Sequence, residues 1–146
     1  MLHIIEGLIK QIKDHGEAHY PEEGAGLIMG RFEGEIRYAE QLLPLANQYE
    51  SSSRHNRYLI EPEEMLNAEL KAEELGLDII GVFHSHPNHP AIPSEFDRER
   101  ALPWYSYIIT RVDSSGALES RSWRLSDDRQ FLEEEIFIHS DKREVL

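Results

Sequence analysis

The 146-residue chain contains no cysteine. Disulfide bonds and thiolate metal sites are therefore excluded, and any transition-metal site has to be built from histidine and carboxylate side chains. Long apolar runs are also missing. None approaches the roughly 18 residues of a membrane-spanning helix, and the N-terminus has no apolar segment of the signal-peptide type. We therefore expect a cytoplasmic protein that has no membrane partner.

Basic residues are scarce, since 15 Lys and Arg stand against 28 Asp and Glu and give a formal net charge of −13. Phosphates bind to basic surfaces, so nucleic acid is not expected as a partner. Apolar residues make up 40% of the chain and charged residues 29%, which is the balance of a soluble globular protein. The length suffices for one domain with its own core, and we interpret residues 1–146 as that single domain.

The hydrophobic pattern alternates between helical and strand periods. Helices are predicted at about 3–19, from Pro62 to just before Gly76, and from Ser94 onward. Strands are predicted at 26–30, 36–43, 58–60, 77–86, 104–112, 118–125 and 131–138, although the acidic run in the last segment also fits a helix. This order predicts an α/β fold with a single mixed β-sheet packed with helices.

Two histidines lie at the end of the apolar strand predicted at 77–86. Residues at i and i+2 of a strand point to the same face, so His84 and His86 are expected to converge on one point. Asp97 lies eleven residues after His86, far enough for a loop to bring its carboxylate back. Two histidines and one carboxylate around an open fourth position form a catalytic zinc arrangement.

Hydrolysis at such a site also needs a group that handles protons. Glu22 and Glu23 stand in a suggestive place, between the first predicted helix and the first core strand. Spacing alone does not choose between them.

The motif resembles the signature of the JAMM (MPN+) metalloproteases, of the small stand-alone bacterial type. That signature is an upstream Glu, then His-Ser/Thr-His, seven residues, Ser, two residues and Asp. Here His84-Ser85-His86 is followed by residues 87–93, Ser94 and Asp97. The segment 20–30 is similar to the family's first-strand segment, in which the catalytic Glu lies seven residues before the closing Gly, and this selects Glu23. Ala25 stands where small bacterial members often carry cysteine.

The resemblance implies a JAMM/MPN (cytidine-deaminase-like) fold and a role for each motif residue. His84, His86 and Asp97 would bind Zn²⁺, Glu23 would act as general base and then acid, and Ser94 would help to stabilise the oxyanion. The implied reaction is hydrolysis of an amide or isopeptide bond by a zinc-activated water.

The implied substrate is the C-terminal tail of a ubiquitin-like or sulfur-carrier protein, which could add as a strand to an exposed edge. The short link between Asp97 and the next predicted strand leaves no room for the long insertion of larger members. Asn47 or Arg54 could contact substrate, with no ranking between them.

Other interpretations stay open. The chain could be a catalytically silent MPN-like scaffold or binding module, although such relatives typically lack motif residues. A non-haem iron oxygenase is a second alternative, since its facial triad also has two histidines and one carboxylate. In that triad the carboxylate usually lies close to the first histidine and the second histidine follows much later, which is the reverse of the grouping here. Ser94 could be only a helix N-cap, Asp97 only a first-turn helical acid and Glu23 only a solvated acid. A last set of side chains is expected to pack in the core: Trp104, Tyr105 and Tyr107.

Overall fold

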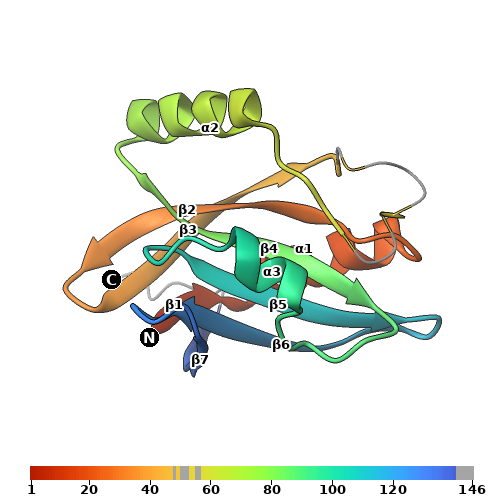
Figure 1. Ribbon diagram of the computed structural model, residues 1–146. Helices are drawn as coiled ribbons and strands as arrows, with labels where there is room; N and C mark the ends of the chain where they lie inside the picture. Colours follow the sequence, from red (N-terminus) through yellow and green to blue (C-terminus); the bar gives the residue numbers. More distant parts are fainter. Residues whose placement is uncertain (48, 50–52, 55–56, 141–146) are drawn as a thin grey trace.

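The computed structural model describes residues 1–47, 49, 53–54 and 57–140. Within them, eight strands form one mixed sheet and three helices lie against it (Figure 1). The elements are β1 (Leu2–Ile5), α1 (Glu6–His19), β2 (Ala25–Glu33), β3 (Ile36–Leu45), α2 (Pro62–Leu75), β4 (Asp78–Pro87), α3 (Glu95–Arg100), β5 (Ser106–Asp113), β6 (Gly116–Leu125), β7 (Phe131–Glu134) and β8 (Ile136–His139). The predicted α/β class with a mixed sheet is confirmed.

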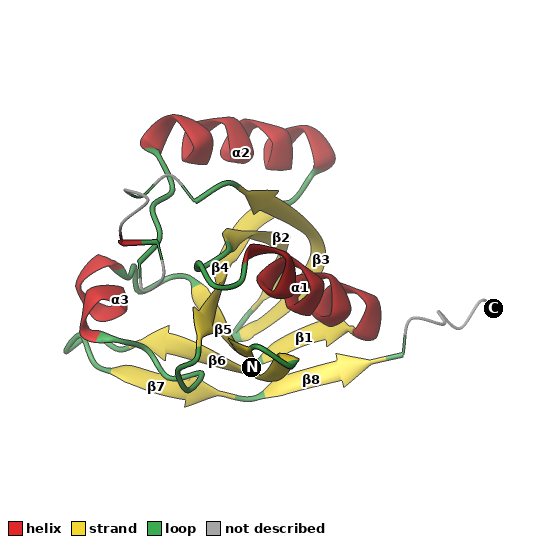
Figure 2. Cartoon of the chain, turned by 90° about the vertical axis from the view of Figure 1, so that its right-hand side faces the viewer, coloured by secondary structure: helices red, strands yellow, loops and turns green. Residues whose placement is uncertain are grey.

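The sheet curls until its two ends are joined by the chain itself. The strand order is β7-β6-β5-β4-β2-β3-β1-β8, so consecutive strands β7 and β8 stand at opposite ends of the order. Only Glu135 separates them, and its carbonyl accepts a hydrogen bond from Leu2 N at 3.0 Å. Figure 2 shows β7 and β8 running one after the other along the same side of the molecule.

Both faces of the central strands are buried. Alternate residues of a strand point to opposite faces. Ile28 and Phe83 accordingly join a core with Leu8 and Ile12 of α1. Their neighbours Leu27 and Val82 join a second core with Ala68 and Ala72 of α2. The sheet therefore forms the middle layer, and β2 and β4 are packed on both faces.

Helix α2 begins and ends where the sequence predicts. Pro62 occupies the first turn, where a missing N–H costs nothing, and the Glu64 carboxylate accepts a hydrogen bond from Glu61 N at 3.2 Å. Gly76 follows the last turn with φ = 72°, a conformation that glycine adopts without strain.

The predicted start of the first helix is wrong. Leu2 to Ile5 form β1, which pairs in parallel with both β3 and β8, and the helix begins at Glu6. Leu2 and Ile4 are fully buried and alternate with partly exposed residues, so the same letters fit a strand as well as a helix. Pairing with distant strands decides between the two.

Three other boundaries differ from prediction. Residues 58–60 form no strand, the segment 131–138 is divided into β7 and β8 at Glu135, and β5 begins at Ser106 rather than Trp104. In the part of the chain that the structure describes, no helix combines the length and apolar character needed to span a bilayer.

Candidate metal centre

The two motif histidines lie at the carboxyl-terminal end of β4 and face each other. Their Nε2 atoms are 3.2 Å apart, and both side chains are buried. The pleat of β4 explains the arrangement, because positions 84 and 86 share one face of the strand. β2 and β5 flank this strand and hold its backbone in place.

Asp97 is carried to the histidines by the first turn of α3. One carboxylate oxygen, Oδ2, lies 3.1 Å from His86 Nε2, and the other, Oδ1, lies 3.4 Å from His84 Nε2. Burial alone would raise the pKa of Asp97, but the two imidazoles outweigh burial and hold that pKa well below its usual range. Burial lowers the pKa of His84. The site therefore favours an ionised carboxylate beside a neutral imidazole, the protonation states that bind a metal ion.

The distances and donor types fit a tetrahedral ion of the zinc type. Ligand atoms around such an ion, each at about 2.0–2.1 Å from it, stand about 3.3 Å apart. The three side chains approach one another at 3.1–3.4 Å. His86 Nδ1 must donate its hydrogen to Pro90 O at 2.9 Å, since a carbonyl only accepts, and Nε2 is left with a free lone pair. The His84, His86 and Asp97 side chains are thus brought together as predicted, and their role as ligands stays a prediction.

Glu23 lies beside this group of side chains, two residues before the start of β2. Its side chain is 3% exposed, and Oε1 has no hydrogen-bond partner among the described residues. One carboxylate oxygen lies within 4.8 Å of ring nitrogens of both His84 and His86. Burial, and then the negative charge of Asp97, raise the pKa of Glu23 to about 9. A cation held by the histidines would favour the ionised form again.

The adjacent Glu22 is not in this position. It is partly exposed and does not line the cavity that contains Glu23. The choice of Glu23 that the resemblance makes is therefore the one with the suitable geometry.

A cavity of about 550 Å³ opens onto the centre. Glu23, His86 and Ser94 line it, together with His89 and Arg57. Ser94 is also the N-cap of α3, because its Oγ accepts a hydrogen bond from Asp97 N at 3.1 Å. The capping role of Ser94 is confirmed, and its proximity to the cavity leaves the second role open to test.

Three further residues position the site, and sequence reasoning assigned none of them a role. Ser85 Oγ, between the two histidines, accepts a hydrogen bond from Gly24 N at 2.8 Å and so joins β4 to the segment that carries Glu23. The ring of Tyr58 stacks on His84, with centroids 4.5 Å apart. Arg57 lines the cavity, and its guanidinium carbon lies 5.2 Å from the Phe96 ring centroid. Neither spacing nor periodicity marks Tyr58 or Arg57, whereas Ser85 stands inside the His-Ser/Thr-His motif.

The two residues expected as candidates for substrate contact form hydrogen bonds around Glu23, and their contact with substrate stays a prediction. Asn47 is buried, and its Nδ2 donates to Glu23 O at 2.9 Å and to Arg57 O at 2.8 Å. Arg54 O accepts from Glu23 N at 2.6 Å, and the Arg54 side chain donates to Tyr49 O. Both therefore position the segment around Glu23.

The expectation that Trp104 packs in the core is wrong. Tyr105 and Tyr107 are buried in the core as predicted, but Trp104 is 55% exposed. It belongs to the turn before β5, so the alternation of the strand does not reach it.

Comparisons of the sequence agree with this geometry. The family model of prokaryotic homologs of the JAB domain matches residues 6–126. A probable TtuB-protein conjugate cleaving protease of Thermus thermophilus is 34% identical over 113 residues, which are 77% of this chain and 72% of that protein. A desampylase of Haloferax volcanii is 27% identical over 126 residues, or 86% of each chain.

Solved structures show the same fold. A protein of Desulfitobacterium hafniense, known from a solution structure, superposes with a TM-score of 0.85 at 28% identity, covering 98% of this chain and 96% of that one. A JAB1/MPN domain protein of Archaeoglobus fulgidus gives a TM-score of 0.59 at 20% identity, covering 94% of this chain and 98% of that one, and supports the fold alone.

Proposed function

The chain belongs to the family of prokaryotic homologs of the JAB domain, and from this premise we propose that it is a zinc metallopeptidase. Its reaction is hydrolysis of the amide or isopeptide bond at the C-terminal tail of a ubiquitin-like or sulfur-carrier protein. The observation that carries the proposal is the approach of the His84, His86 and Asp97 ligand atoms to 3.1–3.4 Å, with the buried Glu23 carboxylate beside them. The names of the two relatives support a ubiquitin-like conjugate as substrate class.

His84, His86 and Asp97 hold the metal in this proposal. When bound, zinc polarises the scissile carbonyl and brings the pKa of a water to about 7. The two imidazoles and the carboxylate would supply three ligands, and His86 lines the cavity that opens onto the centre.

Glu23 moves the proton. Its carboxylate accepts a hydrogen from the attacking water and then donates that hydrogen to the leaving amine. Its buried oxygen Oε1, which has no partner among the described residues, is available for this contact. A cation at the histidines favours the ionised carboxylate that takes the proton, and the acid formed in this way supplies the proton for the second transfer.

Ser94 stabilises the developing negative charge on the carbonyl oxygen. Its Oγ already accepts the Asp97 amide hydrogen, so its own hydroxyl hydrogen remains available to donate toward the cavity. A donor of this kind can be worth about 3 kcal/mol in the transition state.

The segment before α2 offers a place for the substrate tail. A second hollow, of about 190 Å³, lies next to Asp97 and is lined by residues 58–60, with Tyr105 and Tyr107. Residues 57–60 belong to no strand of the sheet. A tail in extended conformation can add beside them through main-chain hydrogen bonds.

The test combines metal analysis with substitution of the base. Purified wild-type protein should hold one zinc per chain by elemental analysis, and Glu23→Gln should keep the metal but lose at least 100-fold in turnover. Glu22→Gln is the matched control and should retain activity. The substrate is a ubiquitin-like carrier joined through its C-terminal carboxyl to a lysine of a reporter protein, followed on gels.

The ligand assignment is tested in the same preparation. His84→Ala and Asp97→Ala should lose the metal, and full zinc retention in either variant contradicts the assignment. No metal in the wild type under zinc-replete conditions would reject the peptidase and favour the silent binding scaffold. Appreciable turnover by Glu23→Gln would reject Glu23 as the base.

A further inference from the structure

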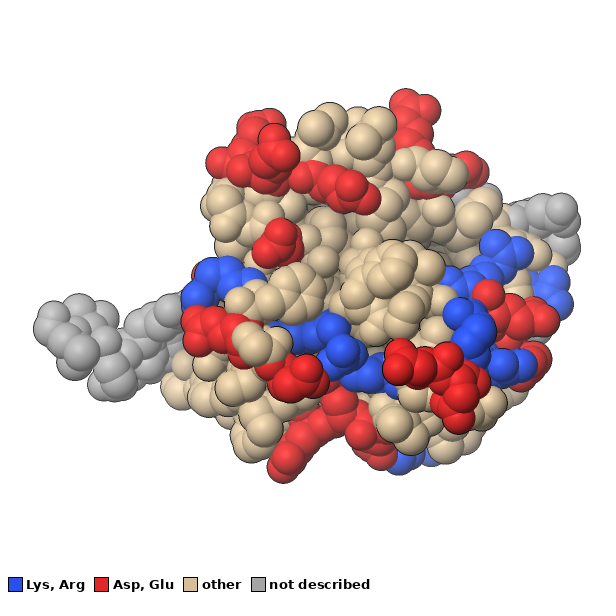
Figure 3. All heavy atoms as spheres, turned by 60° about the vertical axis from the view of Figure 1, so that its left-hand side comes forward, with Lys and Arg blue, Asp and Glu red and all other residues tan. Residues whose placement is uncertain are grey.

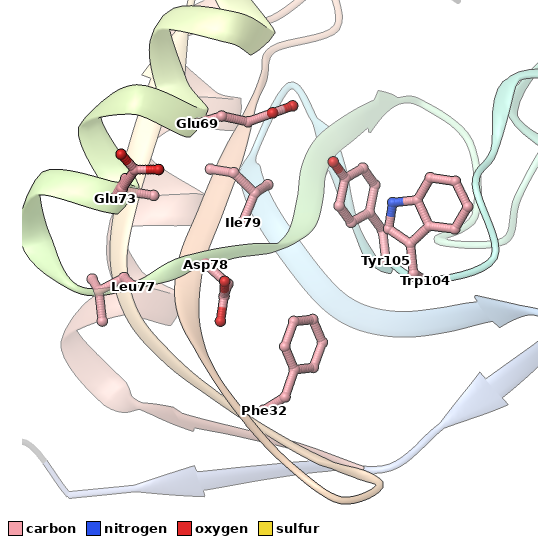
Figure 4. A pocket seen from close by; sticks show the side chains of 9 residues that line it. Phe32, Glu69, Glu73, Leu77, Asp78, Ile79, Trp104 and Tyr105 are labelled. Atoms are coloured by element: carbon pink, nitrogen blue, oxygen red, sulfur yellow. The ribbon is translucent and has the colours of Figure 1, made fainter.

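A third cavity, outside the candidate metal centre, lies between α2, the start of β4 and the turn before β5 (Figure 4). Its volume is about 480 Å³. The side chains used below are Phe32, Glu69, Glu73, Asp78, Trp104 and Tyr105, and together they define the acid–aromatic pocket. None of them belongs to the motif of the metal centre.

One wall of this pocket is aromatic and open to solvent. Trp104 is 55% exposed and Phe32 41% exposed. Tyr105, beneath them, is buried and meets Trp104 edge to face, with ring centroids 6.1 Å apart. An exposed indole fixed against a buried ring offers a large apolar face that a ligand can cover.

The opposite wall is acidic. Glu69 and Glu73 lie one turn apart on α2, and Asp78 is the first residue of β4. Among the described residues, none of these three carboxylates forms an ion pair. Like charges at i and i+4 of a helix repel each other, so this arrangement costs stability that a bound cation would return.

Arg37 is a basic residue near the pocket, but its guanidinium contacts other groups. The Arg37 guanidinium carbon lies 5.0 Å from the Phe32 ring centroid, yet the side chain is buried and donates to Ile80 O and Ser106 Oγ. The exposed face of Trp104 therefore has no cation from Arg37. Figure 3 shows acidic side chains gathered over α2, apart from the row of basic side chains lower on that face.

We propose that the acid–aromatic pocket binds an arginine side chain on the folded body of the substrate protein. A guanidinium is planar and always charged, so it can stack on Trp104 while it donates paired hydrogen bonds to a carboxylate such as Glu69 or Glu73. Figure 4 shows these carboxylates and the indole around the same space.

The location favours a protein rather than a small molecule. Leu66 and Leu70, on the same helix as the pocket acids, are 56% and 53% exposed and extend an apolar surface beyond the cavity. Tyr105 lines both this pocket and the hollow next to Asp97. The folded part of a substrate protein can therefore contact this pocket while its tail lies at the metal centre. This assignment to the substrate rests on the proposed function.

Binding of the guanidinium is tested without any activity. Acetyl-arginine methylamide is titrated into the ¹⁵N-labelled wild-type protein, with the neutral citrulline analogue as the matched ligand. We expect the NMR signals of the Trp104 indole and of the backbone amides of Glu69, Glu73 and Asp78 to shift with the arginine ligand and not with the citrulline analogue.

The variants test the carboxylates. Glu69→Gln combined with Glu73→Gln should weaken binding of the arginine ligand at least fivefold. Glu63→Gln combined with Glu74→Gln removes the same charge from α2 outside the pocket and should leave binding unchanged. Equal shifts with both ligands, or equal weakening in both double variants, would overturn the site.

The assignment to the substrate has a separate readout. On the carrier conjugate, the double variant at Glu69 and Glu73 should raise KM at least fivefold and leave kcat unchanged. Its KM for a short tail peptide should stay at the wild-type value. Selective arginine binding with an unchanged KM for the conjugate would overturn the assignment to the substrate. Failure of wild-type protein to cleave any conjugate would instead reject the proposed function and leave the arginine titration to decide the pocket.

Discussion

Ser94 and Asp97 exchange two hydrogen bonds: Asp97 N donates to Ser94 Oγ at 3.1 Å, and Ser94 N donates to Asp97 Oδ2 at 2.8 Å. The same Oδ2 lies 3.1 Å from His86 Nε2. The Asp97 carboxylate therefore has two roles: it belongs to the capping box of the six-residue helix α3, and it completes the candidate metal centre. The cap fixes the orientation of Asp97, so local helix chemistry and metal ligation depend on the same side chain.

Ser94→Ala should separate the two roles of this serine. We expect zinc content to stay at the wild-type level, kcat to fall about 100-fold, and the free energy of unfolding to drop by about 1 kcal/mol through the lost cap. Ser94→Asp is the matched variant, because it can cap the helix but cannot donate a hydroxyl hydrogen to an oxyanion. Normal kcat in Ser94→Ala together with a large loss of thermal stability would reduce Ser94 to a cap.

Ser85→Ala should weaken the link between the histidine strand and the Glu23 segment. The Gly24 N–H loses its acceptor in a buried position, which costs about 1–3 kcal/mol. Urea unfolding measures this loss, and kcat should fall because Glu23 is no longer held in register with His84. Ser85→Thr keeps the hydroxyl and should stay near wild type. An unchanged unfolding free energy in Ser85→Ala would contradict the link.

The parts of the site that follow from local rules could be predicted from the sequence. The pleat of a strand places His84 and His86 on one face, and the spacing from Ser94 to Asp97 is that of a capping box. Both relationships involve residues at most three positions apart. Sequence reasoning therefore reaches them without knowledge of the fold.

Long-range relationships explain what sequence reasoning missed. Leu2 and Ile4 become a strand because β8, more than 130 residues later in the chain, pairs beside them. Tyr58 resembles a strand residue in its local pattern, yet its segment has no ladder partner and its ring stacks on His84 instead. Trp104 lies outside the alternation of β5 and is free to face solvent. The conformation and burial of these residues depend on which distant element packs or pairs beside them, and the periodicity of the local sequence carries no information about that element.

Asn47→Ala should disturb the site from outside it. The buried amide donates to Glu23 O and Arg57 O and accepts from Tyr49 N and Leu59 N, all between 2.8 and 3.1 Å. Loss of these four bonds should cost about 2–4 kcal/mol of unfolding free energy and lower kcat without loss of zinc. Asn47→Asp is nearly isosteric but cannot donate, so it should be impaired as well. Wild-type stability in Asn47→Asp would show that the two donated bonds contribute nothing.

His15→Gln should change how stability depends on pH. Burial, and then the neighbouring His19, lower the pKa of His15 from 6.5 to about 4. In the folded protein His15 therefore stays neutral between pH 6.5 and 4, whereas in the unfolded chain it takes up a proton. Its contribution to stability is fully present above pH 6.5 and is lost as the pH falls toward 4.

Urea unfolding of wild type and His15→Gln at half-unit steps from pH 7.5 to 4 measures this contribution. The wild type should lose about 1 kcal/mol more than the variant over that interval, since solvent screens the half-exposed ring. The difference between the two proteins should be constant above pH 7, where His15 is neutral in both states. Parallel curves down to pH 4 would mean that the packing of His15 against Phe83, with ring centroids 5.4 Å apart, does not exclude the charged imidazolium.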